Sequence, residues 1–170
     1  MTAVETQPHL IAPHGGYLVD RTRPRPDNVD SLEQVALTSR ELSDLDMLAS
    51  GALSPLEGFM GRDDYERVLE EMRLAKGTPW ALPVCLAVDH QPQGDEVTLT
   101  DEAGKPFAVL EVDETYEYDK EREARNAFRT TDEAHPGVAR LYAQKPLYLA
   151  GRVTVFERAE IGRASCRERV

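Results

Sequence analysis

The first regular hydrophobic pattern along the chain predicts a helix between Thr38 and Gly51. Thr38 and Glu41 stand three residues apart, which is the spacing of an N-terminal capping box. Apolar residues then recur every three or four positions and share one helical face: Leu42, Leu45, Leu48 and Ala49. Gly51 follows at the place where a glycine commonly ends a helix. We therefore expect an amphipathic helix with a buried apolar face.

A second helix is predicted from near Asp63 to Gly77. Asp63 and Glu66 repeat the capping-box spacing, and Gly77 is expected to end the helix. The expected buried stripe consists of Tyr65, Val68, Leu69 and Met72. The segment between the two helices, "ALSPLEGFMG", has the composition of a compact, turn-rich link.

Strand patterns dominate the second half of the chain. Residues 79–89 form a continuous apolar run, typical of a buried strand. Residues 96–101 and 106–119 predict a hairpin with its turn at Gly104, and residues 145–158 predict a strand pair or one long bent strand. Because helices come early and strands follow, the order favours an α+β fold with a small, largely antiparallel sheet or barrel.

Shorter elements complete the prediction. Residues 119–128 indicate a short charged helix, and residues 130–144 indicate a turn that leads into another helix. Residues 10–20 are expected to form a glycine-containing loop that enters a short strand, and residues 21–30 a proline-punctuated connection. Residues 1–9 are predicted to be disordered.

The charge balance narrows the range of partners. The formal net charge is -11 and hydrophobic residues make up 41% of the chain. An acidic surface repels phosphate backbones, which argues against a nucleic-acid partner. No apolar run approaches the ~20 residues needed to span a bilayer, and the start of the chain has neither a basic region nor an apolar core of a signal peptide. We therefore expect a cytoplasmic protein without a membrane partner.

Several residues invite a functional interpretation, and each has a structural alternative. "PHGG" at 13–16 could cradle an anion, but a turn that needs positive φ is the favoured interpretation. Ser54 lacks the context of a catalytic nucleophile and precedes a proline, so we expect a turn residue. Cys85 lies in an apolar run that would make its thiol inert, and Cys166 is interpreted as incidental. His135 precedes Pro136, where capping or packing is favoured over a role as general base.

Paired carboxylates are numerous but are not expected to converge, because adjacent positions on a helix point in different directions. These pairs are Asp44 with Asp46, Asp63 with Asp64, and Glu70 with Glu71. Cysteine and histidine do not cluster with the spacing of metal ligands. The residues themselves therefore predict no catalytic, cofactor-binding or metal-binding site.

Three blocks of the chain resemble the N-terminal domain of the ATP sulfurylase (sulfate adenylyltransferase) family. They occupy residues 10–21, 37–84 and 119–142, and the most specific stretches are "SPLEGFM" and "TTDEAHPGV". The resemblance extends from about Leu10 to Arg158. One position departs from the family pattern, since Arg129 stands where members of the family usually have glycine.

The resemblance implies a PUA-like fold for residues 10–159, a small mixed β pseudo-barrel with peripheral helices. It also implies the reaction of the complete enzyme, in which a sulfate oxygen attacks the α-phosphorus of ATP, with Mg²⁺ on the nucleotide, to give adenylyl sulfate and pyrophosphate. In this family the groups that align the phosphates belong to the following domain, in Gln-x-Arg-Asn, His-x-x-His and Gly-Arg-Asp segments. "EARN" at 123–126 and "GRD" at 61–63 are chance matches, and we assign them no catalytic role.

The resemblance therefore predicts a non-catalytic domain that is inactive alone. Its expected partners are its own catalytic domain and, in the full-length protein, further copies of itself. A PUA-like binding module and the N-terminal part of a fusion between sulfurylase and adenylylsulfate kinase are the alternatives.

The last eleven residues, "EIGRASCRERV" at 160–170, lie beyond the resemblance. They can be back-translated into a string that looks like a common sequencing-library adapter read in frame. We interpret them as a non-native tail that arose in sequence assembly, with no part in the fold.

Overall fold

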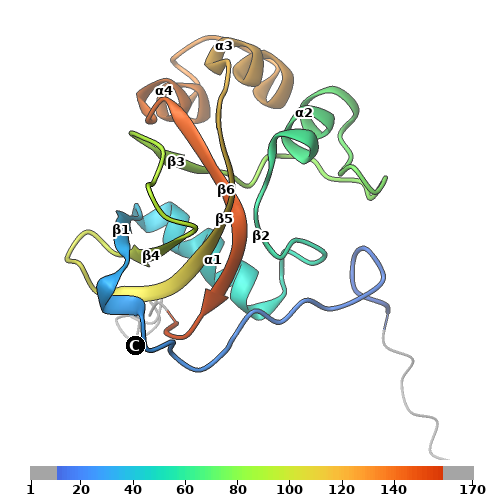
Figure 1. Ribbon diagram of the computed structural model, residues 1–170. Helices are drawn as coiled ribbons and strands as arrows, with labels where there is room; N and C mark the ends of the chain where they lie inside the picture. The colour runs from blue at the N-terminus through green and yellow to red at the C-terminus, as the bar shows by residue number, and fades with distance from the viewer. Residues whose placement is uncertain (1–10, 159–170) are drawn as a thin grey trace, which may run out of the picture.

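The computed structural model describes residues 11–158, so the expectations for residues 1–9 and for the tail at 160–170 lie outside the described residues. The chain forms one mixed, six-stranded sheet with helices around it (Figure 1). Its strands are β1 (Glu33–Ala36), β2 (Gly58–Phe59), β3 (Leu86–Val88), β4 (Glu96–Thr100), β5 (Pro106–Glu117) and β6 (Leu147–Val155). The α+β class is thereby confirmed.

The sheet has the order β1-β4-β5-β6-β2, and β3 also pairs with β6. β1 and β4 are parallel, whereas every other named pair is antiparallel. Figure 1 shows the two longest strands, β5 and β6, curving together through the centre of the molecule. β6 pairs with three strands, since it meets β5 along one side and β2 and β3 along the other.

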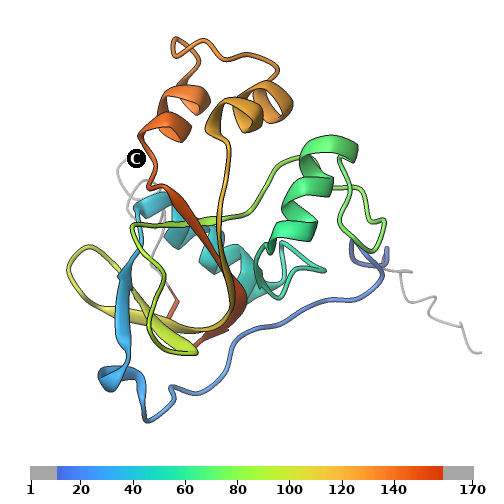
Figure 2. The same cartoon turned by 45° about the horizontal axis from the view of Figure 1, so that its top comes forward.

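The helices surround this sheet, and two of them gather at one end. The α-helices are α1 (Ser39–Ser50), α2 (Arg62–Glu71), α3 (Lys120–Glu123) and α4 (Pro136–Ala143). A 3-10 turn covers Val29–Ser31, and a π-helical turn, Ala124–Phe128, continues α3. Figure 2 shows α3 and α4 side by side above the sheet, with α1 below them.

The prediction for α1 is confirmed in detail. The Thr38 amide donates to the Glu41 carboxylate at 2.8 Å, and the Glu41 amide donates to the Thr38 hydroxyl at 3.4 Å, which completes the capping box. Gly51 ends the helix with φ 78°. Leu45 and Leu48 are buried in the main core, whereas Leu42 is only partly buried at its edge.

The prediction for α2 is confirmed for its start near Asp63 and wrong for its cap and its C-terminal end. The helix begins at Arg62 with Gly61 as its N-cap, so Asp63 lies inside the helix and the expected capping box does not form; Glu66 forms an ion pair with Arg122 instead. Met72 takes left-handed backbone at the C-terminus of the helix and is 48% exposed, so it does not belong to the buried stripe. Gly77 lies beyond the helix in a following turn.

Strand boundaries are where the prediction is least accurate. The apolar run at 79–89 forms a strand only at Leu86–Val88, since the prolines within it interrupt pairing. Residues 11–20 contain no strand, and an isolated bridge between Thr22 and Val155 takes the place of the expected one. The short strands β1 and β2 were not predicted.

The β4–β5 hairpin and the single, long β6 are confirmed. Gly104 forms the hairpin turn with φ 83°. The pairing of β5 with β6 changes register between Val112 and Glu114, opposite Gly151. A side chain at Gly151 would overlap with the carbonyl oxygen of Glu111, so the backbones approach there as only glycine allows.

Arg129 adopts the backbone conformation that the glycine of the family would favour. It ends the π-helical turn with φ 59° and ψ 18°, the left-handed region that costs an ordinary residue ~1 kcal/mol. We expect Arg129→Gly to raise the free energy of unfolding by about 0.5–1 kcal/mol. Urea denaturation measures the change, and the matched variant Arg125→Gly, within the turn, should lower stability. A loss of stability in Arg129→Gly would contradict the prediction.

Candidate functional site

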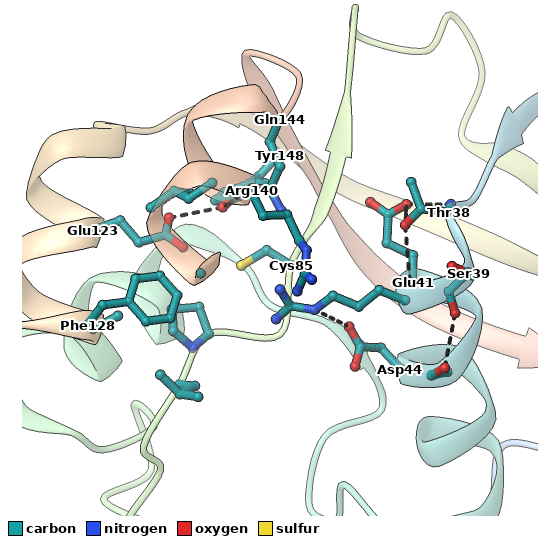
Figure 3. Close-up of a pocket in the computed structure, with 17 residues that line it drawn as sticks. Thr38, Ser39, Glu41, Asp44, Cys85, Glu123, Phe128, Arg140, Gln144 and Tyr148 are labelled. Carbon is teal, nitrogen blue, oxygen red and sulfur yellow. Dashed lines mark hydrogen bonds and ion pairs between the residues drawn. The ribbon is translucent and has the colours of Figure 1, made fainter. Parts of the chain in front are cut away.

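A cavity of about 630 Å³ lies between the start of α1 and the end of the molecule formed by α3 and α4 (Figure 3). Five segments line it: the first two turns of α1, the stretch that precedes β3, the end of α3 with its π-helical turn, α4, and β6 through Tyr148. π-helical turns occur frequently at functional sites. The cavity is therefore the candidate site of the described chain.

Glu123 is the most deeply buried charged group in the cavity wall. The residue is 6% exposed, and its Oε2 accepts hydrogen bonds from the Tyr65 and Tyr148 hydroxyls, each at 2.9 Å. Burial raises the pKa of Glu123, and the two tyrosine hydrogen bonds oppose that rise. Within residues 11–158, no donor contacts its other oxygen, Oε1.

Aromatic rings and a thiol support Glu123 from behind. Tyr118 stacks on Tyr148 with 3.6 Å between ring centroids, and Tyr65 packs edge-on against Tyr148. Cys85 lies 3.8 Å from the Tyr116 hydroxyl, and burial raises the pKa of its thiol. The packed tyrosines hold the Glu123 carboxylate in position, and the partly buried Cys85 lines the same cavity.

Two arginines bring positive charge to the opposite side of the cavity. Arg40, on the first turn of α1, is 3.9 Å from Asp44 and remains 48% exposed at its side chain. Burial raises the pKa of Asp44, and Arg40 opposes the rise. Arg140 extends from α4 into the cavity (Figure 3) and forms no ion pair with any residue in 11–158.

Glu41 also lines the cavity, but both of its carboxylate oxygens accept hydrogen bonds from the protein. Its Oε2 accepts from the Thr38 amide and hydroxyl, and its Oε1 accepts from the Ala87 amide at 3.4 Å. Glu123 Oε1 and the guanidinium groups of Arg40 and Arg140 are available to a ligand, together with the Asp44 carboxylate beside Arg40.

Of the candidate residues considered from the sequence, Cys85 and Asp44 line this cavity, and the others described here have structural roles outside it. Ser54 is buried, accepts from the Val19 amide at 2.9 Å and donates to the Gly51 carbonyl. His135 caps α4 by accepting from the Gly137 amide at 3.2 Å. Gly15 and Gly16 have positive φ, and Gly16 donates to the Pro13 carbonyl, so "PHGG" forms a turn.

The chance motifs are likewise parts of helices. "GRD" at 61–63 begins α2, where the Arg62 amide donates to Glu114. "EARN" at 123–126 passes from α3 into the π-helical turn. Across residues 11–158 we find no group of three or more metal-ligating side chains, and no helix there is long and apolar enough to cross a membrane.

A profile of the PUA-like domain matches residues 11–158. This chain belongs to the PUA-like domain family. The expected PUA-like fold of the domain is thereby confirmed. The two arginines of its cavity were not singled out from the sequence, and Glu123 was named only as the first residue of the chance match "EARN", because the three residues lie on separate elements.

Proteins named sulfate adenylyltransferase are similar to this PUA-like domain, which confirms the resemblance. One from Synechocystis is 46% identical over 159 residues, covering 87% of this chain and 41% of that protein. One from Deinococcus radiodurans is 46% identical over 175 residues, covering 96% of this chain and 45% of that protein. The PUA-like domain thus spans about two fifths of the length of these relatives.

A solved structure shares the fold. The hexameric APS kinase from Thiobacillus denitrificans superposes with a TM-score of 0.68 at 24% identity, covering 92% of this chain and 29% of that chain. At this identity the likeness supports the architecture of the PUA-like domain.

Proposed function

We propose that this PUA-like domain is the N-terminal, non-catalytic domain of a sulfate adenylyltransferase. The complete protein would form adenylyl sulfate and pyrophosphate from ATP and sulfate. The observation that carries the proposal is the 46% identity over 159 residues to the Synechocystis protein of that name. The match spans nearly all of the described residues, so it does not depend on one short motif.

The proposal assigns the chemistry to a separate catalytic domain. ATP, its Mg²⁺ and sulfate would bind there, and no residue of this chain receives a catalytic, cofactor-binding or metal-binding role. The catalytic domain and further copies of the full-length protein would be its partners. A cytoplasmic location without a nucleic-acid or membrane partner accords with a net charge of -11.

Large exposed apolar side chains support a role in contact with other protein surfaces. The first part of the described chain carries three of them: Ile11 at 96%, Tyr17 at 46% and Leu18 at 63% exposure. Apolar surface of this kind is typical of a face that another domain covers. We propose that the segment around them contacts the catalytic domain.

The first test is activity. We expect the 170-residue chain, incubated with ATP, Mg²⁺, sulfate and pyrophosphatase, to release no phosphate above a protein-free control. A full-length relative, such as the Synechocystis sulfate adenylyltransferase, is the positive control. Protein-dependent release that grows with the concentration of the chain would contradict the assignment of a non-catalytic domain.

A domain exchange tests the family role itself. Residues 11–158 would replace the aligned segment of the Synechocystis protein, and activity would be measured in the chimaera. We expect activity within about tenfold of the parent, because the domains share a fold and nearly half of their residues. A chimaera that folds and assembles like the parent, yet lacks activity, would argue against the proposed role.

A further inference from the structure

The cavity beside α1 has the chemistry of a ligand site that the proposed function does not use. Its volume of about 630 Å³ falls within the range typical of small-molecule sites, ~300–1,000 Å³. It combines an apolar wall with a few polar groups that converge from separate elements (Figure 3). Three features of its wall decide what could bind there.

The first feature is a carboxylate, that of Glu123, with one oxygen that accepts no hydrogen bond from the described residues. Glu123 is 6% exposed, and both of its tyrosine donors use Oε2. Among the described residues, the one fully buried side-chain polar atom without a partner is Thr115 Oγ1, so Glu123 Oε1 is not sealed from the cavity. This accessible carboxylate oxygen can accept a hydrogen bond from a ligand N–H group, above all from a cationic one.

The second feature is positive charge on the opposite side. Arg140 has no acidic partner within residues 11–158, and Arg40 has only Asp44, at 3.9 Å. The Asp44 carboxylate already compensates part of the charge of Arg40, so Arg140 is the guanidinium group that most lacks an anionic partner among residues 11–158. A ligand carboxylate or phosphate could pair with Arg140 and with the exposed donors of Arg40, because guanidinium donors match the geometry of such groups.

The third feature is the apolar wall between the two polar ends. Phe128 presents its ring to the cavity (Figure 3), and Leu82, Pro83 and Leu141 also line it. Leu82 is 46% exposed, so part of this wall is in contact with solvent in the free protein. An aromatic or aliphatic body packed against these side chains would remove that apolar surface from water.

We propose that this cavity binds a small zwitterionic organic molecule. Its anionic group would lie between Arg40 and Arg140, its ammonium group would donate to Glu123 Oε1, and its apolar body would pack against Phe128. The site is separate from the proposed role of the domain, which assigns no ligand to this chain. A negative result for the ligand site therefore does not contradict the proposed function, and the reverse also holds.

Amide chemical-shift titration of the 170-residue chain tests the proposal with matched probes. L-Phenylalanine and 4-(aminomethyl)benzoate carry both charges at two different separations, whereas benzoate and benzylamine each carry one. We expect at least one zwitterion to shift the amides of Gly137 and Ala127 saturably and to bind roughly tenfold more tightly than either half. Inorganic phosphate reports binding of an anion alone.

Variants assign the contacts. Arg140→Gln should weaken binding of the zwitterion about fivefold or more, because a charge-assisted contact is lost. Arg125→Gln, which removes an exposed arginine paired with Glu121, should leave affinity unchanged. Glu123→Gln should reduce the affinity of the zwitterion to that of benzoate, with the dispersion of the amide spectrum as a check on folding.

Three results would overturn the proposal. One is no saturable shift with either zwitterion at about 10 mM. Another is equal affinity for a zwitterion and for benzoate or phosphate, which would show a simple anion site. The third is unchanged affinity in Arg140→Gln, a surface variant that leaves the buried carboxylate in place.

Discussion

Gly151→Ala is expected to destabilise the domain by at least about 3 kcal/mol, a large part of the ~5–15 kcal/mol that stabilises a typical domain. Gly151 lies in the middle of β6 with φ 157°. An added Cβ would overlap with the carbonyl oxygen of Glu111 on β5 and press on the side chain of Leu110. Neither strand can move away easily, because β5 and β6 pair along nearly the whole length of β6.

Urea denaturation followed by the fluorescence of Trp80, the single tryptophan, measures this loss. Gly104→Ala is the matched control: it also places alanine at a positive φ, 83°, but no atom lies within 4 Å of its Cβ. We expect it to cost only about 1–2 kcal/mol, from the backbone conformation alone. Equal losses in the two variants would show that the close approach of β5 and β6 contributes nothing.

Glu123→Ala is expected to cost about 2–4 kcal/mol, because it leaves buried hydroxyl groups without an acceptor. Tyr65 would lose the one hydrogen bond that its hydroxyl donates, and Tyr148 would retain only Gln144, at 3.2 Å. Glu123→Gln preserves an acceptor oxygen in nearly the same volume and should lose much less. Thermal and urea unfolding of the three proteins provide the comparison, and equal stability of the Ala and Gln variants would contradict this account.

The difference in stability between the wild-type protein and Glu123→Gln is expected to depend on pH. Burial raises the pKa of Glu123 above its ordinary value of 4.5. The carboxyl group of Glu123 therefore binds its proton more tightly in the folded state than in the unfolded state. The stability that Glu123 contributes is therefore complete below pH 4.5 and declines as the pH rises through the folded pKa. The advantage of the wild-type protein over Glu123→Gln should shrink between pH 4.5 and neutrality. An advantage that grows over this range would contradict the raised pKa.

Elements with local signals could be predicted from the sequence. The capping box of Thr38 and Glu41, the terminal Gly51 and the Gly104 turn each depend on residues close together in the chain, and all three form as expected. β1 could not be predicted in this way. It is four residues long and is stabilised by pairing with β4, more than sixty residues away.

The errors in α2 concern its N-terminal cap and its C-terminal end. Glu66 was expected to close a capping box, but the fold brings Arg122 of α3 within ion-pair distance of it. Met72 was expected to extend the buried stripe, but the helix ends there in left-handed backbone and turns the side chain to solvent. Helical periodicity describes a face only as far as the helix continues.

The cavity shows more clearly that local sequence patterns cannot predict which distant residues come together. Arg40, Glu123 and Arg140 are ordinary charged residues at the positions where they occur in the sequence. Only the fold, which packs α1 against β6 and places α3 and α4 at one end of the molecule, brings them to one cavity. A sequence motif could not reveal the site, since no two of the three belong to the same helix.

The position of β6 has a consequence for how the chain folds during synthesis. β2, β3 and β5 all pair with it, yet Leu147–Val155 is the last strand of the described residues to be made. Until those residues leave the ribosome, β2 and β3 have no pairing partner among the named strands, and one edge of β5 is exposed. α1 and the β4–β5 hairpin can form earlier from local contacts. We therefore expect nascent chains that stop before Leu147 to bind chaperones and to be degraded by proteases, and chains that extend past Val155 to acquire resistance in a single step.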